Sequence, residues 1–302
     1  MSLLSSAPST SLALPPTPAS GAASAMDRGS TVGGDVLERV RPASTRRSVP
    51  RPVSRLTGVV LVLGIWQFLC DSGVITPDVL GSPIHVARQA VHLIANGALP
   101  DAIGASVQRV LLGLVLGGGI AVALAVVSGV FRWGEDLVDA PVQMLRTVPL
   151  AGLVPLLIVW LGVGEVPKIV LIGLGAGFPL YINVLAGIRL VDPGLIEMGS
   201  TLGLSRRQTL RRIVLPAALP NVLVGLRIAL GTSWLALVFA EQISATSGLG
   251  YLMSTAQELL QTDTIVVCLV TYACLGLLAD LVVRGLERRL LRWQPRFAGG
   301  AR

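Results

Sequence analysis

The succession of long apolar runs along this chain constrains its fold more than any other feature. Hydrophobic residues make up 52% of the 302 residues, charged residues only 14%, and the mean hydropathy is +0.73. A typical soluble chain has about 25% charged residues. Because too few charges remain to cover a soluble surface, the composition argues against a water-soluble enzyme. It predicts an all-α, polytopic membrane protein.

Six apolar runs are long enough, or nearly so, to cross a hydrocarbon layer that needs about 20 helical residues. The third is preceded by Pro149 and interrupted by Pro155, so we expect a kinked or broken helix there. Small residues recur in the second and fourth runs, a pattern that lets membrane helices pack closely. The predicted spans are 56–69 (or as far as 75), 106–130, 150–163, 169–190, 217–240 and 265–283. The small residues are Gly113, Gly117, Ala121, Ala125 and Gly129 in the second, and Gly173 and Gly177 in the fourth.

The runs divide the chain into three parts. Residues 1–55 are rich in Ser, Ala and Pro and end in a basic stretch, which predicts a disordered tail. The membrane domain is expected over 56–290, followed by a basic C-terminal tail at 291–302. If the six spans alternate, one side of the membrane receives twenty basic residues and the other side two. Because basic loops stay inside, both termini are predicted to be cytoplasmic.

Ser82-Pro83 predicts the start of a further, amphipathic helix, which would lie on the outer membrane surface. Asn96-Gly97 should end it. Its apolar side is expected to hold Ile84, Ala87, Val91, Ile94 and Ala95.

The sequence has no pattern for a nucleotide or metal site. The lone Lys168 follows Pro167, whereas a P-loop needs Gly directly before its Lys. The two His and three Cys residues have no metal-ligand spacing. The cations lie between apolar runs, which favours topology signals over a nucleic-acid surface. We therefore expect no cofactor, metal or nucleic acid on this chain.

The segment 191–216, between the fourth and fifth spans, is the most informative. Asp192-Pro193 predicts a short helix up to about Leu202, which Gly203 would end in a left-handed conformation. Ser205 and Gln208 then form a capping box for a second helix through to Pro216. Two capped helices joined at a glycine predict a compact protruding element; an ordinary amphipathic loop is the alternative.

This segment resembles the EAA motif of binding-protein-dependent ABC importer permeases, the MetI-like superfamily. The family pattern has Glu-Ala-Ala, three residues, Gly, nine residues, Ile, one residue, and Leu-Pro. Glu197, Gly203, Ile213 and Leu215-Pro216 match every spacing, whereas Met198 and Gly199 replace the two alanines. The resemblance covers about 60–295 and is greatest for the nitrate, sulfonate and taurine branch. Its further matches are 160–164, 225–231, 240–241, 248–250, 286–289 and Trp293.

The resemblance implies a multi-pass permease of the bacterial cytoplasmic (inner) membrane, with six transmembrane helices and cytoplasmic coupling helices. Its partners would be two ABC ATPase subunits that hold ATP and Mg²⁺, an extracellular, periplasmic or lipid-anchored solute-binding protein, membrane lipids and a second permease copy. A small anion such as a sulfonate, taurine or nitrate would be its substrate. The implied ATPase-coupling residues are Glu197, Gly203, Leu204, Ser205, Arg206, Arg207, Ile213, Leu215 and Pro216.

Charged residues inside spans are costly and are usually functional or paired. Arg227 would either give the pathway a positive potential or fix helix register by pairing with Asp280 or Glu241. Glu241 would act at a gate or a binding-protein contact, or be solvated at the rim.

The rival functions differ in what they require of these residues. An ion-gradient-driven secondary transporter would have only Asp280 and Glu241 as mid-membrane carboxylates. A membrane enzyme would need a group of His, Cys or paired acidic residues in one span, and this sequence has none. A scaffold protein would not need two capped connector helices.

Overall fold

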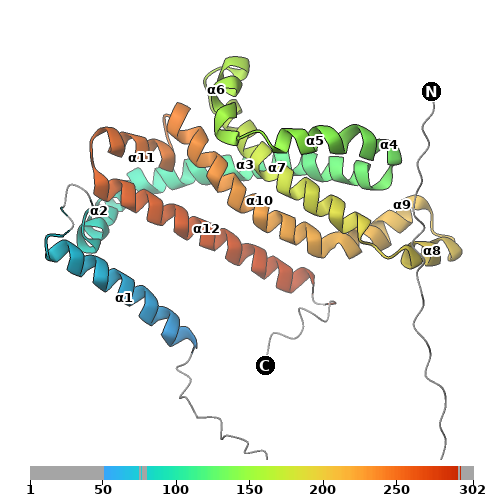
Figure 1. The fold of residues 1–302 in the computed structure, drawn as a ribbon, viewed down its shortest axis with the longest axis horizontal. Helices are drawn as coiled ribbons and strands as arrows, with labels where there is room; N and C mark the ends of the chain where they lie inside the picture. Colours follow the sequence, from blue (N-terminus) through green and yellow to red (C-terminus); the bar gives the residue numbers. More distant parts are fainter. Residues whose placement is uncertain (1–50, 75, 77–79, 292, 294–302) are drawn as a thin grey trace, which may run out of the picture. The chain divides into compact units, whose positions relative to one another are not determined.

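The computed structural model describes residues 51–74, 76, 80–291 and 293, and all regular structure within them is helical (Figure 1). Most of the two predicted tails lies outside these residues. The first described helix begins at Arg51, inside the basic end of the tail predicted over 1–55, and the predicted division of the chain stays a prediction.

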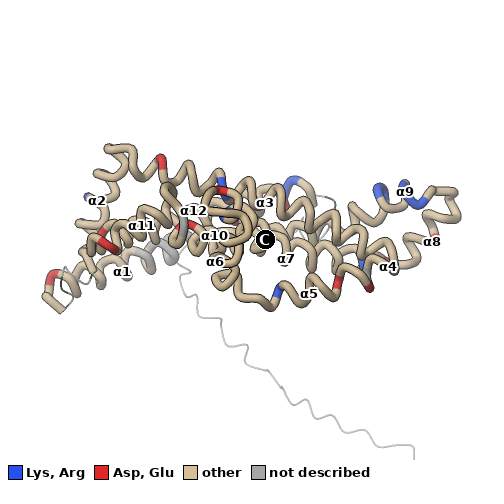
Figure 2. Tube along the Cα trace, turned by 90° about the horizontal axis from the view of Figure 1, so that it is seen from above, with Lys and Arg blue, Asp and Glu red and all other residues tan. Residues whose placement is uncertain are grey.

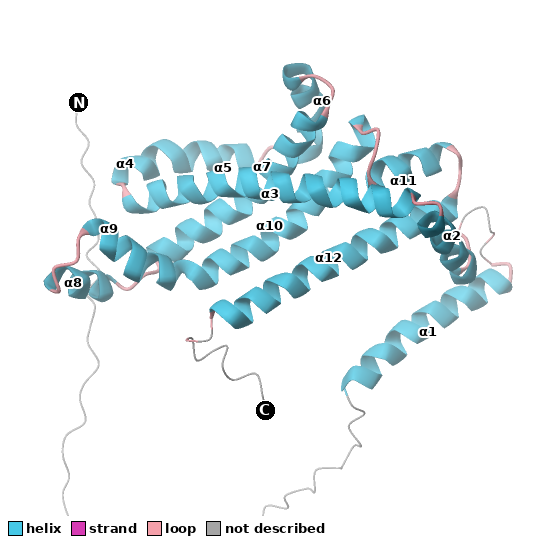
Figure 3. Ribbon diagram, turned by 180° about the vertical axis from the view of Figure 1, so that it is seen from behind, coloured by secondary structure: helices cyan, strands magenta, loops and turns pink. Residues whose placement is uncertain are grey.

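Five long helices make up most of the membrane domain, and shorter helices join them (Figure 3). The long helices are α1 (Arg51–Asp71), α3 (Ala98–Val130), α7 (Glu165–Arg189), α10 (Leu215–Ser244) and α12 (Thr262–Leu290). The shorter α-helices are α2 (Pro83–Ala95), α4 (Arg132–Gly134), α5 (Ala140–Arg146), α6 (Leu150–Leu161), α8 (Pro193–Thr201), α9 (Arg206–Thr209) and α11 (Leu249–Glu258). Two π-helical segments, η1 (Glu135–Asp139) and η2 (Leu210–Val214), lie within this series.

Four of the described helices are long and apolar enough to cross a membrane, and they contain α3, α7, α10 and α12. A bent pair, Asp136–Arg146 with Leu150–Leu161, qualifies as a fifth span when its two parts are taken together. In α1 the described apolar part, Val60–Asp71, is shorter than a full crossing. The count of six therefore stays a prediction, whereas the all-helical, multi-pass architecture is confirmed.

The third predicted span forms a continuous helix, α6, with Pro155 inside it, and the bend lies just before this span rather than within it. The two parts of the pair meet at 106° across residues 147–149, whereas Pro155 lies inside α6. Pro149 has no N–H to donate and disfavours helical geometry at the residue before it, which explains the position of the bend. Residues 131–146, which lie between the second and third predicted spans, are helical for most of their length.

Small residues hold α7 between α3 and α10. A Cβ on Gly117 of α3 would overlap the backbone of Gly173 in α7. On the other side of α7, a Cβ on Gly187 would approach Ala218 and Asn221 of α10. Such close backbone approach replaces the hydrophobic attraction that lipid cannot supply. The predicted small-residue stripes are thus confirmed as the helix-packing faces.

α2 packs against the protein through residues outside its predicted apolar stripe, and the contact of that stripe with the membrane surface stays a prediction. Val86 and Leu93 are buried, whereas Ile84, Val91 and Ile94 of the predicted stripe are exposed. Apolar residues occur on both sides of this helix, so the sequence alone did not distinguish the face that packs. The Gln89 amide also donates a 3.0 Å hydrogen bond to the hydroxyl of Thr264 in α12, which fixes the buried side.

Candidate functional site

The first connector helix, α8, is fixed at both ends by its own sequence. Asp192 caps its start, because its Oδ1 accepts a 2.8 Å hydrogen bond from the Gly194 N–H. At its end, the Gly203 N–H donates to the Ser200 carbonyl and the Leu204 N–H to the Gly199 carbonyl, both at 3.0 Å. Gly203 has a φ of +75°, the left-handed conformation that this Schellman turn requires.

The second connector helix begins at the predicted capping box. The Ser205 N–H donates to Oε1 of Gln208 at 2.8 Å, and the Gln208 N–H donates to Oγ of Ser205 at 3.4 Å. The helix does not stop near Pro216, however; it continues through α9, η2 and α10 as a single apolar helix over Arg206–Ile243. Pro216 cannot donate a backbone hydrogen bond, and the helix widens to π geometry just before it. The connector is therefore one short helix folded against the base of a long one.

A packed contact holds the two connector helices together. Gly199 of α8 is buried, and a Cβ there would lie 2.8 Å from Cδ1 of Ile213 and 3.6 Å from Cδ1 of Leu204. The glycine that replaces the second alanine of the family pattern therefore lets Ile213 approach the α8 backbone. Rigidity of this kind lets the element transmit a displacement instead of absorbing it.

The outer surface of the connector is apolar on α8 and basic on the base of the long helix. Met198 is 51% exposed and Leu202 is 72% exposed, and Glu197 lies on the same exposed helix. Apolar side chains that stay exposed on a compact element indicate an interaction site. Basic residues gather at and beside α9 (Figure 2). Arg206 and Arg207 in α9 and Arg211 and Arg212 in η2 are all exposed. Of the other predicted coupling residues, Leu215 and Pro216 are exposed, and Ile213 faces the packed contact.

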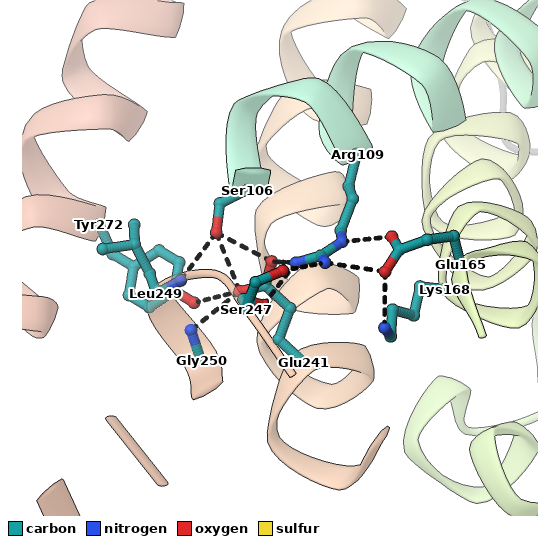
Figure 4. A network of polar contacts seen from close by, with 9 residues as sticks. All are labelled: Ser106, Arg109, Glu165, Lys168, Glu241, Ser247, Leu249, Gly250 and Tyr272. Atoms are coloured by element: carbon teal, nitrogen blue, oxygen red, sulfur yellow. Dashed lines mark hydrogen bonds and ion pairs between the residues drawn. The ribbon is translucent and has the colours of Figure 1, made fainter. Parts of the chain in front are cut away.

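A polar network lies at the other end of α10 (Figure 4). Arg109 of α3 donates to both carboxylate oxygens of Glu165 in α7, at 2.6 and 2.9 Å, and to Oε1 of Glu241 in α10 at 2.6 Å. It also donates to the carbonyl and the hydroxyl of Ser247. Lys168 pairs with Glu165 at 2.9 Å. Two cations and two carboxylates thus balance in charge across three helices.

Glu241 is the centre of this network. It is 1% exposed and accepts hydrogen bonds from the Ser106 hydroxyl at 2.9 Å, the Gly250 N–H at 2.8 Å and the Tyr272 hydroxyl at 3.4 Å. Gly248, with a φ of +107°, leaves room for the pair, because a Cβ there would lie 2.6 Å from the Arg109 guanidinium. The alternative of rim solvation for Glu241 is therefore wrong: the turn after α10 folds back over it.

Arg227 is paired, and one of its two predicted partners is correct. Its Nε lies 3.1 Å from Asp280 and its terminal nitrogen 2.7 Å from Glu287, both in α12. The Asp280 contact is an ion pair without hydrogen-bond alignment. The alternative partner, Glu241, is wrong because it is on the same helix, fourteen residues or about 21 Å further on.

Sequence reasoning missed the part that Arg109, Ser106 and Glu165 play. The available signal was a charge match: Arg109 and Glu241 are single charges near the same predicted end of two opposite-running spans. The covering turn, which brings Ser247 to Arg109, had no comparable signal. Within the described residues, no group of three or more His, Cys, Asp and Glu side chains could hold a metal ion.

Comparison with known proteins identifies the family to which this sequence is similar. Residues 110–292 match the family model described as "Binding-protein-dependent transport system inner membrane component". The chain is 45% identical to an Escherichia coli protein named as an aliphatic sulfonates transport permease protein, SsuC, over 78% of this chain and 90% of that one. It is 33% identical to the taurine transport system permease protein TauC of Escherichia coli (82% and 92% covered). The nitrate import permease protein NrtB of Synechocystis is 30% identical (79% and 89%).

The fold also matches a solved structure. A chain from the crystal structure of an amino acid ABC transporter superposes with a TM-score of 0.52, over 66% of this chain and 97% of that one, at 17% identity. That likeness concerns the fold alone. The family model and the curated relatives together show that this chain belongs to the binding-protein-dependent inner-membrane permeases of ABC transport systems.

Proposed function

We propose that this chain is the permease subunit of an ATP-driven importer for small aliphatic sulfonates or a related small anion. The family is that of non-enzymatic, multi-pass membrane components, whose ATPase is a separate subunit. The substrate class rests on relatives named for aliphatic sulfonates, taurine and nitrate. Each of these solutes carries an anionic group, so the import of a small solute with an anionic group is the function common to these relatives.

One observation carries the mechanism: the connector is folded onto the base of a single long helix whose far end enters the Arg109–Glu241 network. From Arg206 to Glu241 this helix covers about 52 Å at 1.5 Å per residue. A displacement of α8 is thereby applied to an element that reaches the other end of the protein. We propose that ATPase subunits, which hold ATP and Mg²⁺, bind α8 through the exposed side chains of Met198 and Glu197 and through Leu202 at its C-terminal end.

The energy for changing conformation must come from these partners, because a ligand shifts two states only by its differential affinity for them. We also propose that the connector and both termini are cytoplasmic, which the basic residues of α9 and η2 support by the positive-inside rule. We further propose that two identical copies meet to enclose the pathway and present two connectors to two ATPases. A binding protein, periplasmic or lipid-anchored, would deliver the solute at the opposite end.

For Arg227 and Glu241 a pathway role stays a prediction. Their contacts favour a structural role for both, since Arg227 is neutralised by two carboxylates of α12 and Glu241 is closed off by Arg109 and the following turn. Neither residue leaves an unpaired charge for a passing anion. The same contacts weaken the secondary-transporter alternative, because its two candidate carboxylates, Asp280 and Glu241, are both held in ion pairs.

The test is uptake of radiolabelled ethanesulfonate into vesicles that contain the permease, its ATPase subunits and the loaded binding protein. We expect uptake that requires ATP and stops when the ATPase is omitted. Uptake by the permease alone, driven by a proton or sodium gradient, would contradict the proposal and favour the secondary transporter.

A further inference from the structure

A cavity of about 350 Å³ lies where the break between α5 and α6 meets α7 and α10. Arg146, the last residue of α5, is at its edge. Its walls are largely apolar and include Leu150, Phe178, Ile182 and Ile228. Cavities of this size are in the range that small-molecule sites occupy.

The cavity lies near the middle of the helices that line it. Phe178 is about 20 Å along α7 from Glu165 and about 17 Å from Arg189, at 1.5 Å per residue. Thr232 and Ile228 are likewise in the central part of α10. Arg146 and Leu150, which both line the cavity, lie on either side of the bend between α5 and α6. Transporters commonly place their solute sites near the midplane, at helices broken in this way.

Arg146 differs from the other two arginines at membrane depth. Arg109 and Arg227 each pair with two carboxylates. Arg146 is exposed, and among the described carboxylates none forms an ion pair with it. A charge at this depth is costly and marks a functional site unless a partner compensates it. Strict alternation of the six predicted spans would put Arg146, between the second and third spans, on the cytoplasmic side, which does not fit these mid-helix neighbours.

We propose that this cavity is a transit site in the permease, with Arg146 as the group that receives the anionic head of an aliphatic sulfonate. The guanidinium fork matches a planar pair of sulfonate oxygens, as it matches carboxylate or phosphate. The alkyl tail then lies against Phe178, Ile182 and Ile228, where it leaves water. The inference rests on the proposed function and adds to it the binding residue, Arg146, and the location of the transit site.

The experiment compares Arg146→Gln with Arg146→Lys in the reconstituted importer, using ethanesulfonate uptake and ATP hydrolysis as separate readouts. Loss of a charge-assisted contact should reduce uptake by Arg146→Gln at least about tenfold, while hydrolysis without substrate stays normal. Arg146→Lys, which keeps the charge, should recover much of the uptake. Arg284→Gln, which removes an exposed arginine of α12 instead, is the matched control and should transport normally.

A second variant tests the apolar wall. Ile228→Trp narrows the cavity, so it should slow butanesulfonate uptake more than methanesulfonate uptake. The ratio of the two rates is compared with that of the wild type with the same binding protein, which removes the binding protein's own selectivity.

The failures can be told apart. If wild-type vesicles take up no sulfonate, the proposed function fails, and this inference with it. If the wild type transports and Arg146→Gln transports equally well, only the inference is overturned. It is also overturned if Arg146→Gln no longer assembles with its partners on size-exclusion chromatography, because the arginine would then be a structural contact.

Discussion

The Arg109–Glu241 pair allows a quantitative test of how the outer end of the permease is held. Arg109→Met leaves the carboxylate of Glu241, 1% exposed, without its cation. Removing one partner of a buried ion pair costs about 3–5 kcal/mol of unfolding free energy. At about 2–4 °C per kcal/mol for a domain of roughly this size, the melting temperature should fall by about 6–20 °C.

The assay is the fraction of purified, detergent-solubilised permease that stays monodisperse on size-exclusion chromatography after heating. Glu165→Gln is the control, because the Glu165 side chain is 52% exposed and such a pair contributes at most about 1 kcal/mol. The double variant, Arg109→Met with Glu241→Gln, removes both charges, and the new amide can still accept from the Gly250 N–H. It should therefore be more stable than Arg109→Met alone. A double variant whose loss equals the sum of the single losses would refute the coupling.

Three further predictions concern other parts of the molecule. Gly117→Leu should prevent stable folding, because its side chain would overlap the Gly173 backbone. Gly119→Leu on the same helix should fold, because a Cβ there meets nothing within 4 Å. The two variants are compared by their expression level and by their monodispersity on size-exclusion chromatography. Gly203→Pro and Glu197→Lys should leave the permease inserted but abolish substrate-stimulated ATP hydrolysis, and normal stimulation in a stable Gly203→Pro protein would count against the coupling role. Arg227→Asp should lower thermal stability, because it adds a carboxylate beside Asp280 and Glu287. A compensating Asp280→Arg substitution should restore both stability and uptake. Restored stability without restored uptake would instead support a pathway role for Arg227.

The helical architecture could be predicted because local signals and membrane physics agree. Ser205 and Gln208 cap a helix by their own hydrogen bonds, and Gly203 adopts a positive φ that other residues disfavour. The small residues of α3 and α7 had only one plausible use in lipid, which was close packing. These features needed no knowledge of distant contacts.

The errors arose where distant contacts decide the outcome. The joining of the second connector helix to the fifth span depends on a π-helical adjustment before Pro216, which a proline in the sequence does not reveal. The buried face of α2 depends on its hydrogen bond to Thr264, 175 residues away. Rim solvation stayed open as an alternative for Glu241 because nothing in the sequence shows that residues 245–250 fold back over it.

Only the part of the candidate site that is encoded by neighbouring residues could be predicted from the sequence. The connector residues form a contiguous motif, so their spacing could be recognised along the chain. Arg109 and Arg146 have no motif, and their neighbours come from α7 and α10 for Arg109 and from α6, α7 and α10 for Arg146. Only the fold distinguishes an arginine paired with two carboxylates from one that lines a cavity.

The most direct test of the coupling account is the reactivity of a cysteine placed at Leu202, the most exposed apolar side chain of the connector at 72%. The variant is made after Cys70, Cys268 and Cys274 are replaced by serine, and a cysteine at Leu260, on the α11–α12 turn, serves as the control. Adding the ATPase subunits should slow maleimide labelling at position 202 at least about tenfold and leave position 260 unchanged. Equal labelling at position 202 with and without the assembled ATPase would contradict the account.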